Sequence, residues 1–291
     1  MPNLRDVKLR IRSVKNTQQM TKAMKLVSAS KLRRAQQAIL KARPYAVKLM
    51  SVMKSLEARC NPDLHPLLED REGKRILLLV ITSDRGLCGA FNANILRVAR
   101  QVIEKNPGRE FSLICAGKKG NEFFKRREVP IRETFLNWTK DFDYLKAQDI
   151  GRQLGDMFVE RTTDKIYLVY NEFKSVLRQE VILEQLLPIV PAAAEEGGGK
   201  GSSLTVDYIY EPDEESILEH ILLRHMTVQV YRAFLESSAS EHGARMTAMD
   251  NASRNASEML DKLTLFYNRT RQAYITKELI EVVNGAESLK A

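Results

Sequence analysis

The chain has 291 residues, 44% of them hydrophobic and 29% charged, with a formal net charge of +9. Its longest apolar run, residues 76–81, is far shorter than the ~20 residues that a bilayer-spanning helix needs. The three cysteines, Cys60, Cys88 and Cys115, are widely spaced and form neither a CxxC zinc motif nor a disulfide framework. Composition therefore excludes a membrane-embedded protein and a disulfide-stapled secreted domain, and it favours a reducing compartment.

Positive charge is concentrated in the first 60 residues, which hold fifteen Lys or Arg against two acidic residues, Asp6 and Glu57. A mitochondrial presequence is also basic and acid-poor, but here the pattern runs on for longer than presequences do. A nucleic-acid-binding arm would use these charges to neutralise phosphates. However, Tyr45 is the one aromatic residue in the segment for base stacking. A basic face that meets solvent or other proteins is favoured, and nucleic-acid binding stays as an alternative.

Residues 3–43 contain no Gly or Pro, which predicts one long helix that continues to about residue 58. Pro44 removes one backbone hydrogen bond, and we expect it to bend this helix without ending it. Apolar residues recur at alternating spacings of three and four, which is typical of a narrow coiled-coil seam. We expect the register to slip at the polar stretch between Lys15 and Gln19. The predicted seam consists of Leu4, Val7, Ile11, Val14, Met20, Met24, Val27, Leu32, Ala35, Ile39, Ala42, Ala46, Leu49, Met53 and Leu56.

The middle of the chain changes character. Residues 75–82, 111–116 and 165–170 are rich in Ile, Leu and Val and predict buried strands. Residues 90–105, 118–126 and 144–161 predict intervening helices. This alternation indicates a small, mostly parallel α/β sheet. Residues 191–203, with three consecutive glycines, predict a flexible surface loop.

A second long helix is predicted over residues 212–283, with Pro212 and the acids around it marking its start and Asn284-Gly285 its end. The small and polar residues 237–243 would let two helices approach closely. The predicted seam members of this helix are Ile217, Ile221, Val228, Tyr231, Leu235, Met246, Met249, Ala256, Leu260, Leu263, Tyr267, Thr270 and Tyr274.

At ~1.5 Å per residue the two helices would reach about 84 and 108 Å, longer than an ordinary small domain. We therefore expect them to bury their seams on each other as an antiparallel coiled coil. The predicted fold class is α/β. Residues 1–60 form an N-terminal coiled-coil helix, 61–208 a central Rossmann-like domain and 209–291 a C-terminal coiled-coil helix.

Motifs for catalysis or cofactors are weak. Residues 83–89 follow a strand and open a helix, the right place for a phosphate loop, but match neither GxGxxG nor GxxxxGK[ST]. Residues 197–203 resemble a P-loop superficially, with glycine after the lysine where Ser or Thr is required. The four histidines are scattered. We expect no catalytic residue, cofactor or metal site. A nucleotide-binding enzyme stays as a second alternative, and Cys88 is expected to be a loop cysteine that reagents can reach.

Three stretches together resemble the gamma subunit of F-type ATP synthases, and the resemblance covers essentially the whole chain. They are residues 13–31, with the sequence SVKNTQQMTKAM followed by VSASK; residues 84–89, DRGLCG; and residues 271–286, RQAYITKELIEVVNGA. The resemblance implies a rotor shaft whose coiled coil turns inside a ring of three alpha and three beta subunits. It also implies a Rossmann-like foot beside the epsilon subunit and the c-ring, with the chemistry carried by beta.

The resemblance also implies contact residues, position by position. Met24 and Arg245 match the shaft region that faces the beta lever, and Cys88 with its loop matches a segment that approaches the same lever. Arg271 and Gln272, with Thr276 close by, match a polar pair that engages a beta catch loop. The c-ring contacts would be Tyr208, Tyr210 and Glu211.

Two further expectations follow from the family pattern. The cysteine-bearing insertion of the chloroplast form does not appear, so thiol control is not expected. The lack of a recognisable presequence indicates a bacterial subunit, peripheral on the cytoplasmic face of the inner membrane and touching the membrane only through the c-ring. A shaft turning in a sleeve should have charged outer faces, because deep apolar contacts would trap each step.

Overall fold

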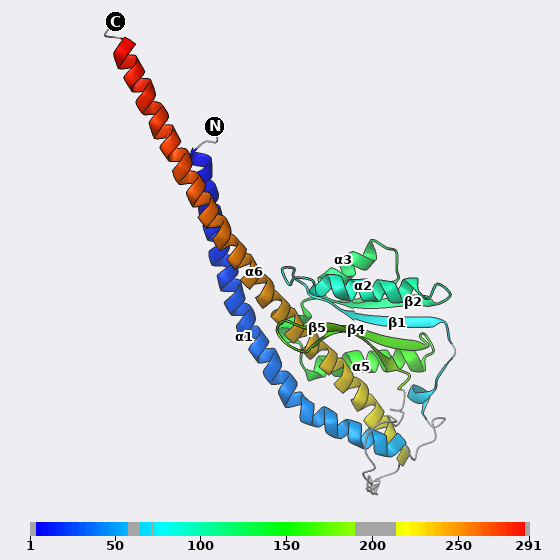
Figure 1. Cartoon of the computed structure of the whole chain (residues 1–291). Helices are drawn as coiled ribbons and strands as arrows, with labels where there is room; N and C mark the ends of the chain where they lie inside the picture. Colours follow the sequence, from blue (N-terminus) through cyan, green and yellow to red (C-terminus); the bar gives the residue numbers. More distant parts are fainter. Residues whose placement is uncertain (1–3, 58–64, 72, 190–213, 289–291) are drawn as a thin grey trace, which may run out of the picture. The chain divides into compact units, whose positions relative to one another are not determined.

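The computed structural model describes residues 4–57, 65–71, 73–189 and 214–288 (Figure 1). The long first helix passes through Pro44 without ending, as predicted. Each strand and helix predicted in the middle of the chain is present, and several short elements were not predicted. In chain order the elements are α1 (Leu4–Glu57), the 3-10 turn η2 (Pro66–Leu68), β1 (Arg75–Ile81), α2 (Phe91–Glu104), β2 (Glu110–Ala116), α3 (Lys118–Lys125), β3 (Ile131–Phe135), α4 (Trp138–Asp141), α5 (Tyr144–Val159), β4 (Lys165–Phe173), β5 (Gln179–Leu187) and α6 (Glu214–Ser288).

The chain divides into two compact units. The rod unit comprises Met1–Ser28 and Arg245–Ala291, and the sheet unit comprises Ala29–Ala244. Both long helices cross from one unit to the other, so neither helix belongs to one unit alone.

The sheet unit is built on five strands in the order β3-β2-β1-β4-β5. The pairs β1/β2, β1/β4 and β2/β3 are parallel, and β5 runs antiparallel to β4 at one edge. The edge strands β3 and β5 are the ones the sequence did not predict. Their apolar residues are interleaved with charged ones, because an edge strand is only partly covered. The mostly parallel α/β class is confirmed.

Two hydrophobic cores lie on the two faces of this sheet. Alternate residues of β1 point to opposite faces: Leu77, Leu79 and Ile81 enter one core, and Ile76, Leu78 and Val80 enter the other. Helix α5 and part of α6 cover the first face, whereas α2 and α3 cover the second, as Figure 1 shows. Residues 76–81 of β1 are therefore all apolar, as expected for a central strand covered on both sides.

Helix α6 contributes to this core more than the sequence predicted. Leu222, Met226, Val230, Ala233 and Phe234 are all fully buried in the core that includes α5 and the sheet. The expectation that both long helices bury their apolar residues on each other alone is therefore wrong for this part of α6. The reason is that a helix can carry two apolar faces, whereas the alternating spacing of three and four residues identifies only one of them.

In the rod unit the two helices run antiparallel, side by side (Figure 1). The predicted slip in the α1 seam is wrong. Residues that are buried or half-buried continue at spacings of three and four without a break, through Gln18, Thr21, Lys25 and Ser28. Met20 and Val27, assigned to the seam from hydrophobicity, are 64% and 57% exposed. The heptad spacing decides which positions are covered, and here small and polar residues fill them.

The α6 side of the rod follows the prediction more closely. Met249 and Ala256 are buried, Leu260, Leu263, Tyr267 and Thr270 are half-buried, and Ser253 joins them. Tyr274 is 49% exposed, so the covered seam ends before it.

The C-terminal end of α6 differs from expectation in two ways. The helix continues through Asn284-Gly285 to Ser288, because a helical glycine costs only about 1 kcal/mol when helix-forming residues follow it. Every residue from Arg271 to Ala286 is exposed. Since Leu279, Ile280 and Val282 are 61%, 54% and 69% exposed, the outer face of this segment is apolar as well as charged.

Candidate functional site

The predicted contact residues of the rod unit differ in exposure. Met24 is half-buried beside the seam, Arg245 is only 9% exposed, and Arg271, Gln272 and Thr276 are exposed. The exposed three lie within two turns of one helix, so a partner can reach them together.

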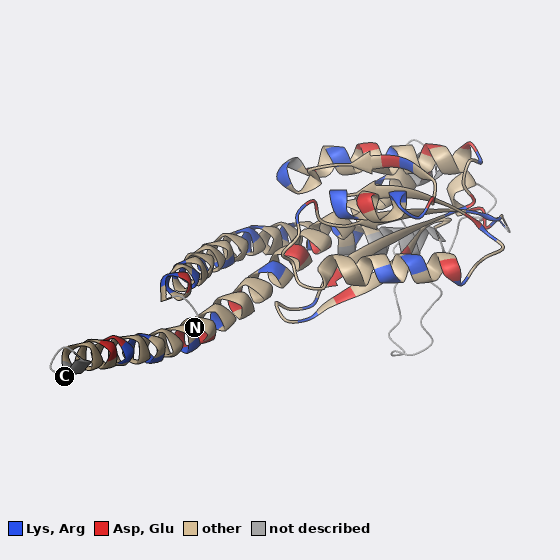
Figure 2. Ribbon diagram, turned by 90° about the horizontal axis from the view of Figure 1, so that it is seen from above, with Lys and Arg blue, Asp and Glu red and all other residues tan. Residues whose placement is uncertain are grey.

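An ionic group joins the two helices of the rod near Met24. Lys25 Nζ donates to Asp250 Oδ1 at 2.5 Å, and Arg254 donates to Asp250 Oδ2 at 2.6 Å. The hydrogen bond from Lys25 lowers the pKa of Asp250, and Arg254 acts in the same direction. A lysine at a seam position therefore has its carboxylate partner on the opposite helix. Figure 2 shows that Lys and Arg recur along α1.

The strand-end loop, residues 83–89, connects β1 to α2. Asn92, in the first turn of α2, holds both ends of the loop. Its Oδ1 accepts from Ser83 N at 3.0 Å, and its Nδ2 donates to Ser83 Oγ at 2.7 Å and to Cys88 Sγ at 3.2 Å. Cys88 is only 2% exposed, so the expectation of a thiol that reagents can reach is wrong. The exposed residues of the loop include Arg85 and Leu87.

The crevice at the carboxyl ends of the strands is filled by the chain itself. Ligands of such sheets bind where the strand order reverses, which here is between β1 and β4. At the end of β4, Asn171 donates to Phe91 O at 3.4 Å and accepts at its carbonyl from Ser240 Oγ of α6 at 3.1 Å. At the end of β1, the carbonyl of Thr82 accepts from the Trp138 indole at 2.8 Å.

Amides at the start of α3, the helix that follows β2, are also occupied. Asp84 Oδ1 accepts from Lys118 N at 3.2 Å, at the start of α3, and from Asn137 N at 3.0 Å. Thr82 Oγ1 accepts from Gly120 N at 2.9 Å. A carboxylate and a hydroxyl of this chain thus take the place that an anion has at helix N-termini of nucleotide-binding folds.

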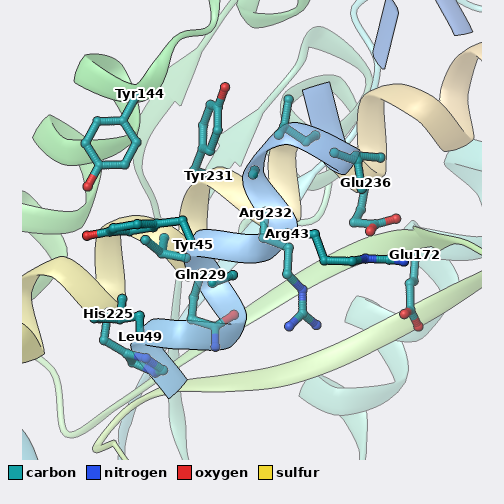
Figure 3. A pocket seen from close by; sticks show the side chains of 15 residues that line it. Arg43, Tyr45, Leu49, Tyr144, Glu172, His225, Gln229, Tyr231, Arg232 and Glu236 are labelled. Atoms are coloured by element: carbon teal, nitrogen blue, oxygen red, sulfur yellow. The ribbon is translucent and has the colours of Figure 1, made fainter. Parts of the chain in front are cut away.

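A cavity of about 690 Å³ lies within the sheet unit, between α1, α5, β4 and α6. Figure 3 shows Tyr45, Tyr144 and Tyr231 on one side of it, and Arg43, Glu172 and Glu236 on the other. Its size suits a small ligand.

Charged side chains around this cavity form ion pairs with neighbouring residues. Glu172 pairs with Lys174 at 2.8 Å, and Arg232 lies 3.6 Å from Glu184. Burial lowers the pKa of His225 to about 4, with Arg232 acting in the same direction, so this histidine is neutral at pH 7. Burial raises the pKa of Glu236. With opposite charges paired and both signs present, the cavity selects no class of ligand.

The remaining expectations lie partly outside the described residues. Tyr208, Tyr210, Glu211 and the predicted loop 191–203 all fall there. Within the described ranges, no group of three or more His, Cys, Asp or Glu is arranged to hold a metal ion.

The helices of the described ranges include none that is both long and apolar enough to cross a bilayer.

Comparison with known proteins identifies the family. The model of the family described as ATP synthase matches residues 3–289. The ATP synthase gamma chain of Geobacter sp. (strain M21) is 49% identical over 292 residues, covering all of both chains. That of Geotalea uraniireducens is 50% identical with the same coverage. The chain belongs to the gamma-chain family of ATP synthases.

Solved structures agree with this membership. A chain in the central stalk and c-ring structure of the Tetrahymena thermophila mitochondrial ATP synthase is 27% identical, with a TM-score of 0.61, over 80% of this chain and 99% of that one. A chain of the Euglena gracilis mitochondrial enzyme in rotational state 3 shares the fold, with a TM-score of 0.72 at 22% identity. This fold is thus kept in solved structures at low sequence identity.

The structural roles of several residues that organise this chain were not predicted from the sequence, although Asp84, Thr21 and Ser28 lie in the motif stretches. Asn92, Asp84 and Trp138 close the strand ends, and Thr21 and Ser28 fill the seam of the rod. The one available signal was the unbroken spacing of three and four through Thr21 and Ser28, which a count of apolar residues overlooks. The contacts of Asp84 and Trp138 span more than 30 residues of sequence and left no local pattern.

Proposed function

We propose that this chain is the central-stalk rotor subunit of an F-type ATP synthase, and that it transmits torque between an ion-driven c-ring and a catalytic hexamer of alpha and beta subunits. The observation that carries the proposal is the end of α6. A continuous helix extends through residues 271–286 with every side chain exposed, in a chain that matches gamma chains over its full length. An apolar helix end that its own chain does not cover is explained by a surrounding partner.

The rod unit has the features of a shaft. Its seam is thin and contains Thr21, Ser28 and Ser253, so most of each helix surface is left for other contacts. We propose that Met24, Arg245, Arg271, Gln272 and Thr276 contact beta subunits. Because exposed charged and polar pairs are individually weak, the contacts of the exposed Arg271, Gln272 and Thr276 can form and break at each step of rotation.

We propose that the sheet unit is the foot of the stalk, with the epsilon subunit and the c-ring as its neighbours. Tyr208, Tyr210 and Glu211 stay as the predicted c-ring contacts. In this arrangement the chain meets the membrane only through the c-ring, on the cytoplasmic face of a bacterial inner membrane.

The chain itself is proposed to be non-catalytic and to bind no nucleotide. The support is the filled crevice, where the end of β4 bonds to α6 and the end of β1 bonds to Trp138. Amides at the start of α3 likewise donate to Asp84 and Thr82 of this chain. Catalysis would then reside in the beta subunits. Nucleic-acid binding keeps the basic face of α1 as its only support, and a full-length match to gamma chains offers it none.

Direct observation of rotation tests the proposal. The alpha–beta hexamer is fixed to a surface and assembled with this chain, and a bead is attached through a cysteine introduced by Arg109→Cys, an exposed position of the sheet unit. Cys60→Ser keeps the label at one site, since Cys88 and Cys115 are buried. ATP should drive continuous rotation of the bead in one direction. A hexamer that takes up this chain and hydrolyses ATP while the bead stays still would contradict the proposal.

The proposed catch contacts need a separate test. The double variant Arg271→Ala with Gln272→Ala should lower ATP-driven ion pumping in membrane vesicles while leaving assembly and helix content unchanged. Asp261→Ala with Lys262→Ala, also exposed on α6, is the matched control and should pump normally. Unchanged pumping in the first variant would remove Arg271 and Gln272 from the contact set.

A further inference from the structure

A second cavity of the sheet unit, about 620 Å³ in volume, lies between α5 and the N-terminal part of α6. Both helices cover the same face of the sheet (Figure 1). Gly151 of α5 packs directly on α6, since a Cβ added to this glycine would be 3.4 Å from Thr227 Cα. This contact fixes the two walls of the cavity relative to each other.

Each wall of this cavity presents one polar stripe of a helix. Residues three or four apart share a face of a helix, so the members of each stripe point in the same direction. The polar lining residues are Tyr144, Gln148 and Arg152 on α5, and His220, Arg224 and Thr227 on α6.

The permanent charges in the lining are all positive. Arg152 and Arg224 line the cavity, and none of the described residues that line it is a carboxylate. Within the part of the chain that the structure describes, neither arginine forms an ion pair with a carboxylate. Asp149 and Glu219 are exposed and lie next to lining residues in sequence, but about 100° further around their helices. The two guanidinium groups therefore have no counter-charge within these ranges.

Tyr144 adds a neutral donor beside the arginines. Burial raises the pKa of this phenol, and Tyr45 acts in the same direction. Arg224 donates a hydrogen bond to the phenol oxygen, and this arginine lowers the pKa, a smaller effect. The phenol is thus neutral at pH 7, and its O–H group is left to donate to a ligand.

The larger cavity, which Tyr144 also lines, provides the contrast. There Glu172 and Glu236 are lining residues, and Arg232 lies 3.6 Å from Glu184. Its charges are of both signs, whereas those of the second cavity are of one sign. Charge complementarity therefore favours an anion in the second cavity and no charge class in the first.

The kind of anion follows from where the donors are. The two arginines lie on opposite walls, one on α5 and one on α6. A single planar carboxylate pairs well with one guanidinium fork, whereas a phosphate or diphosphate has oxygens on several sides and can accept from both. The cavity volume of about 620 Å³ leaves room for more than one phosphate group.

We propose that the cavity between α5 and α6 binds a phosphate-type anion, with Arg152 and Arg224 as its charged ligands and Tyr144 and Gln148 as neutral donors. The bound anion links the N-terminal part of α6 to α5. Binding here is independent of torque transmission, and the rotor proposal does not depend on it.

Titration of the full chain with inorganic pyrophosphate tests this site. Calorimetry should show saturable binding that weakens about tenfold or more in Arg152→Gln with Arg224→Gln, because charge-assisted hydrogen bonds are lost. Arg97→Gln with Arg109→Gln removes two exposed arginines elsewhere on the sheet unit and should bind as the wild type does. Equal weakening in the two double variants, or no binding to the wild type, overturns the proposal.

Chemical protection gives a second measurement on the wild type, which does not depend on how the variants fold. Phenylglyoxal modifies accessible arginines, and peptide mass spectrometry resolves the rate at each one. Pyrophosphate should slow the modification of Arg152 and Arg224, which are both exposed, and leave Arg97 and Arg109 unchanged. Equal rates at Arg152 and Arg224 with and without pyrophosphate exclude the site.

The phosphate group can belong to a dissolved anion or to a lipid headgroup, and vesicle flotation distinguishes them. The vesicles are phosphatidylcholine with or without phosphatidylglycerol. Equal flotation of the wild type and the Arg152→Gln, Arg224→Gln variant assigns the site to a dissolved anion. Weaker flotation of this variant, with the Arg97→Gln, Arg109→Gln control unchanged, assigns it to a headgroup. An equal decrease in both double variants indicates unspecific attraction and counts against a site.

Discussion

The two units of this chain bury different kinds of residue. In the sheet unit, most fully buried positions hold apolar residues such as Leu, Ile, Val and Phe, and alternate residues of β1 enter separate cores. In the rod unit, covered positions include Thr21, Ser28 and Ser253, whereas Leu265 and Leu279 are 71% and 61% exposed. The sheet unit thus has an apolar core of its own, and the rod unit presents apolar surface of a kind usually covered by partners.

The difference shows that, in a helix that contacts other proteins, the hydrophobicity of a residue does not predict whether its own chain buries it. A sheet covered on both faces buries whatever its strands carry, so composition and burial agree. A two-helix rod buries one narrow stripe, and heptad spacing alone decides which residues lie on it. Four changes test this comparison, from the largest expected effect to the smallest.

Phe234→Ala should be the most damaging. Phe234 is fully buried, stacks on Phe142 with ring centroids 4.1 Å apart and meets Trp138 edge-on. The cavity left behind should lower the free energy of unfolding by about 3–5 kcal/mol in urea titrations. Phe266→Ala in the rod unit, at a side chain already 44% exposed, is the control and should cost far less. Equal losses in the two variants would remove the proposed contrast between the units.

Asp164→Ala should cost about 1.5–3 kcal/mol at pH 7, because it removes a buried, charged hydrogen-bond partner. Its carboxylate accepts from Arg75 N, Nε and Nη2 at 2.9, 3.1 and 2.8 Å. The hydrogen bonds from Arg75 lower the pKa of Asp164. Because the folded pKa is below the unfolded one, this stability is present above about pH 4 and is lost as pH falls further. Urea midpoints from pH 7 to pH 3 should therefore fall more steeply in the wild type than in Asp164→Ala.

Ser28→Leu tests the corrected seam. Ser28 is 2% exposed at a covered seam position, so a larger side chain should force the helices apart and cost about 1–3 kcal/mol. Val27→Ser, at a neighbour that is 57% exposed, should be close to neutral. Thermal unfolding followed by circular dichroism at the helix band distinguishes them. A damaging Val27→Ser with a harmless Ser28→Leu would restore the register predicted from hydrophobicity.

The smallest effect is expected for Lys25→Ala. The ion pair of Lys25 with Asp250 has side chains that are 38% and 30% exposed, so its loss should cost about 0.2–1 kcal/mol. Salt should reduce the difference between wild type and variant, because exposed charges are screened. The measurement is a pair of urea titrations at low and high ionic strength. A loss that salt leaves unchanged would mean that Lys25 acts through packing of its aliphatic chain.

The sequence by itself determined the elements that local pattern controls. Spacing and composition predict both long helices, the α/β character of the middle and three of the five strands. A short, wholly apolar run such as residues 76–81, for example, predicts a buried strand. The three motif stretches led to the correct family in the same way, since each is contiguous.

Only the tertiary structure decided which face of each helix is covered and what closes the strand ends. Ser28 is buried and Val27 exposed because a second helix lies over one stripe of α1, and α6 joins the sheet core through Phe234 because it carries a second apolar face. Asp84 holds the strand-end loop to the start of α3, and Asn92 of α2 holds the loop at Ser83, through contacts that form when the chain is folded. Burial of a residue depends on a second segment that lies far away in the sequence. A local sequence pattern describes only the segment that holds the residue, so it does not show which of its faces will be covered.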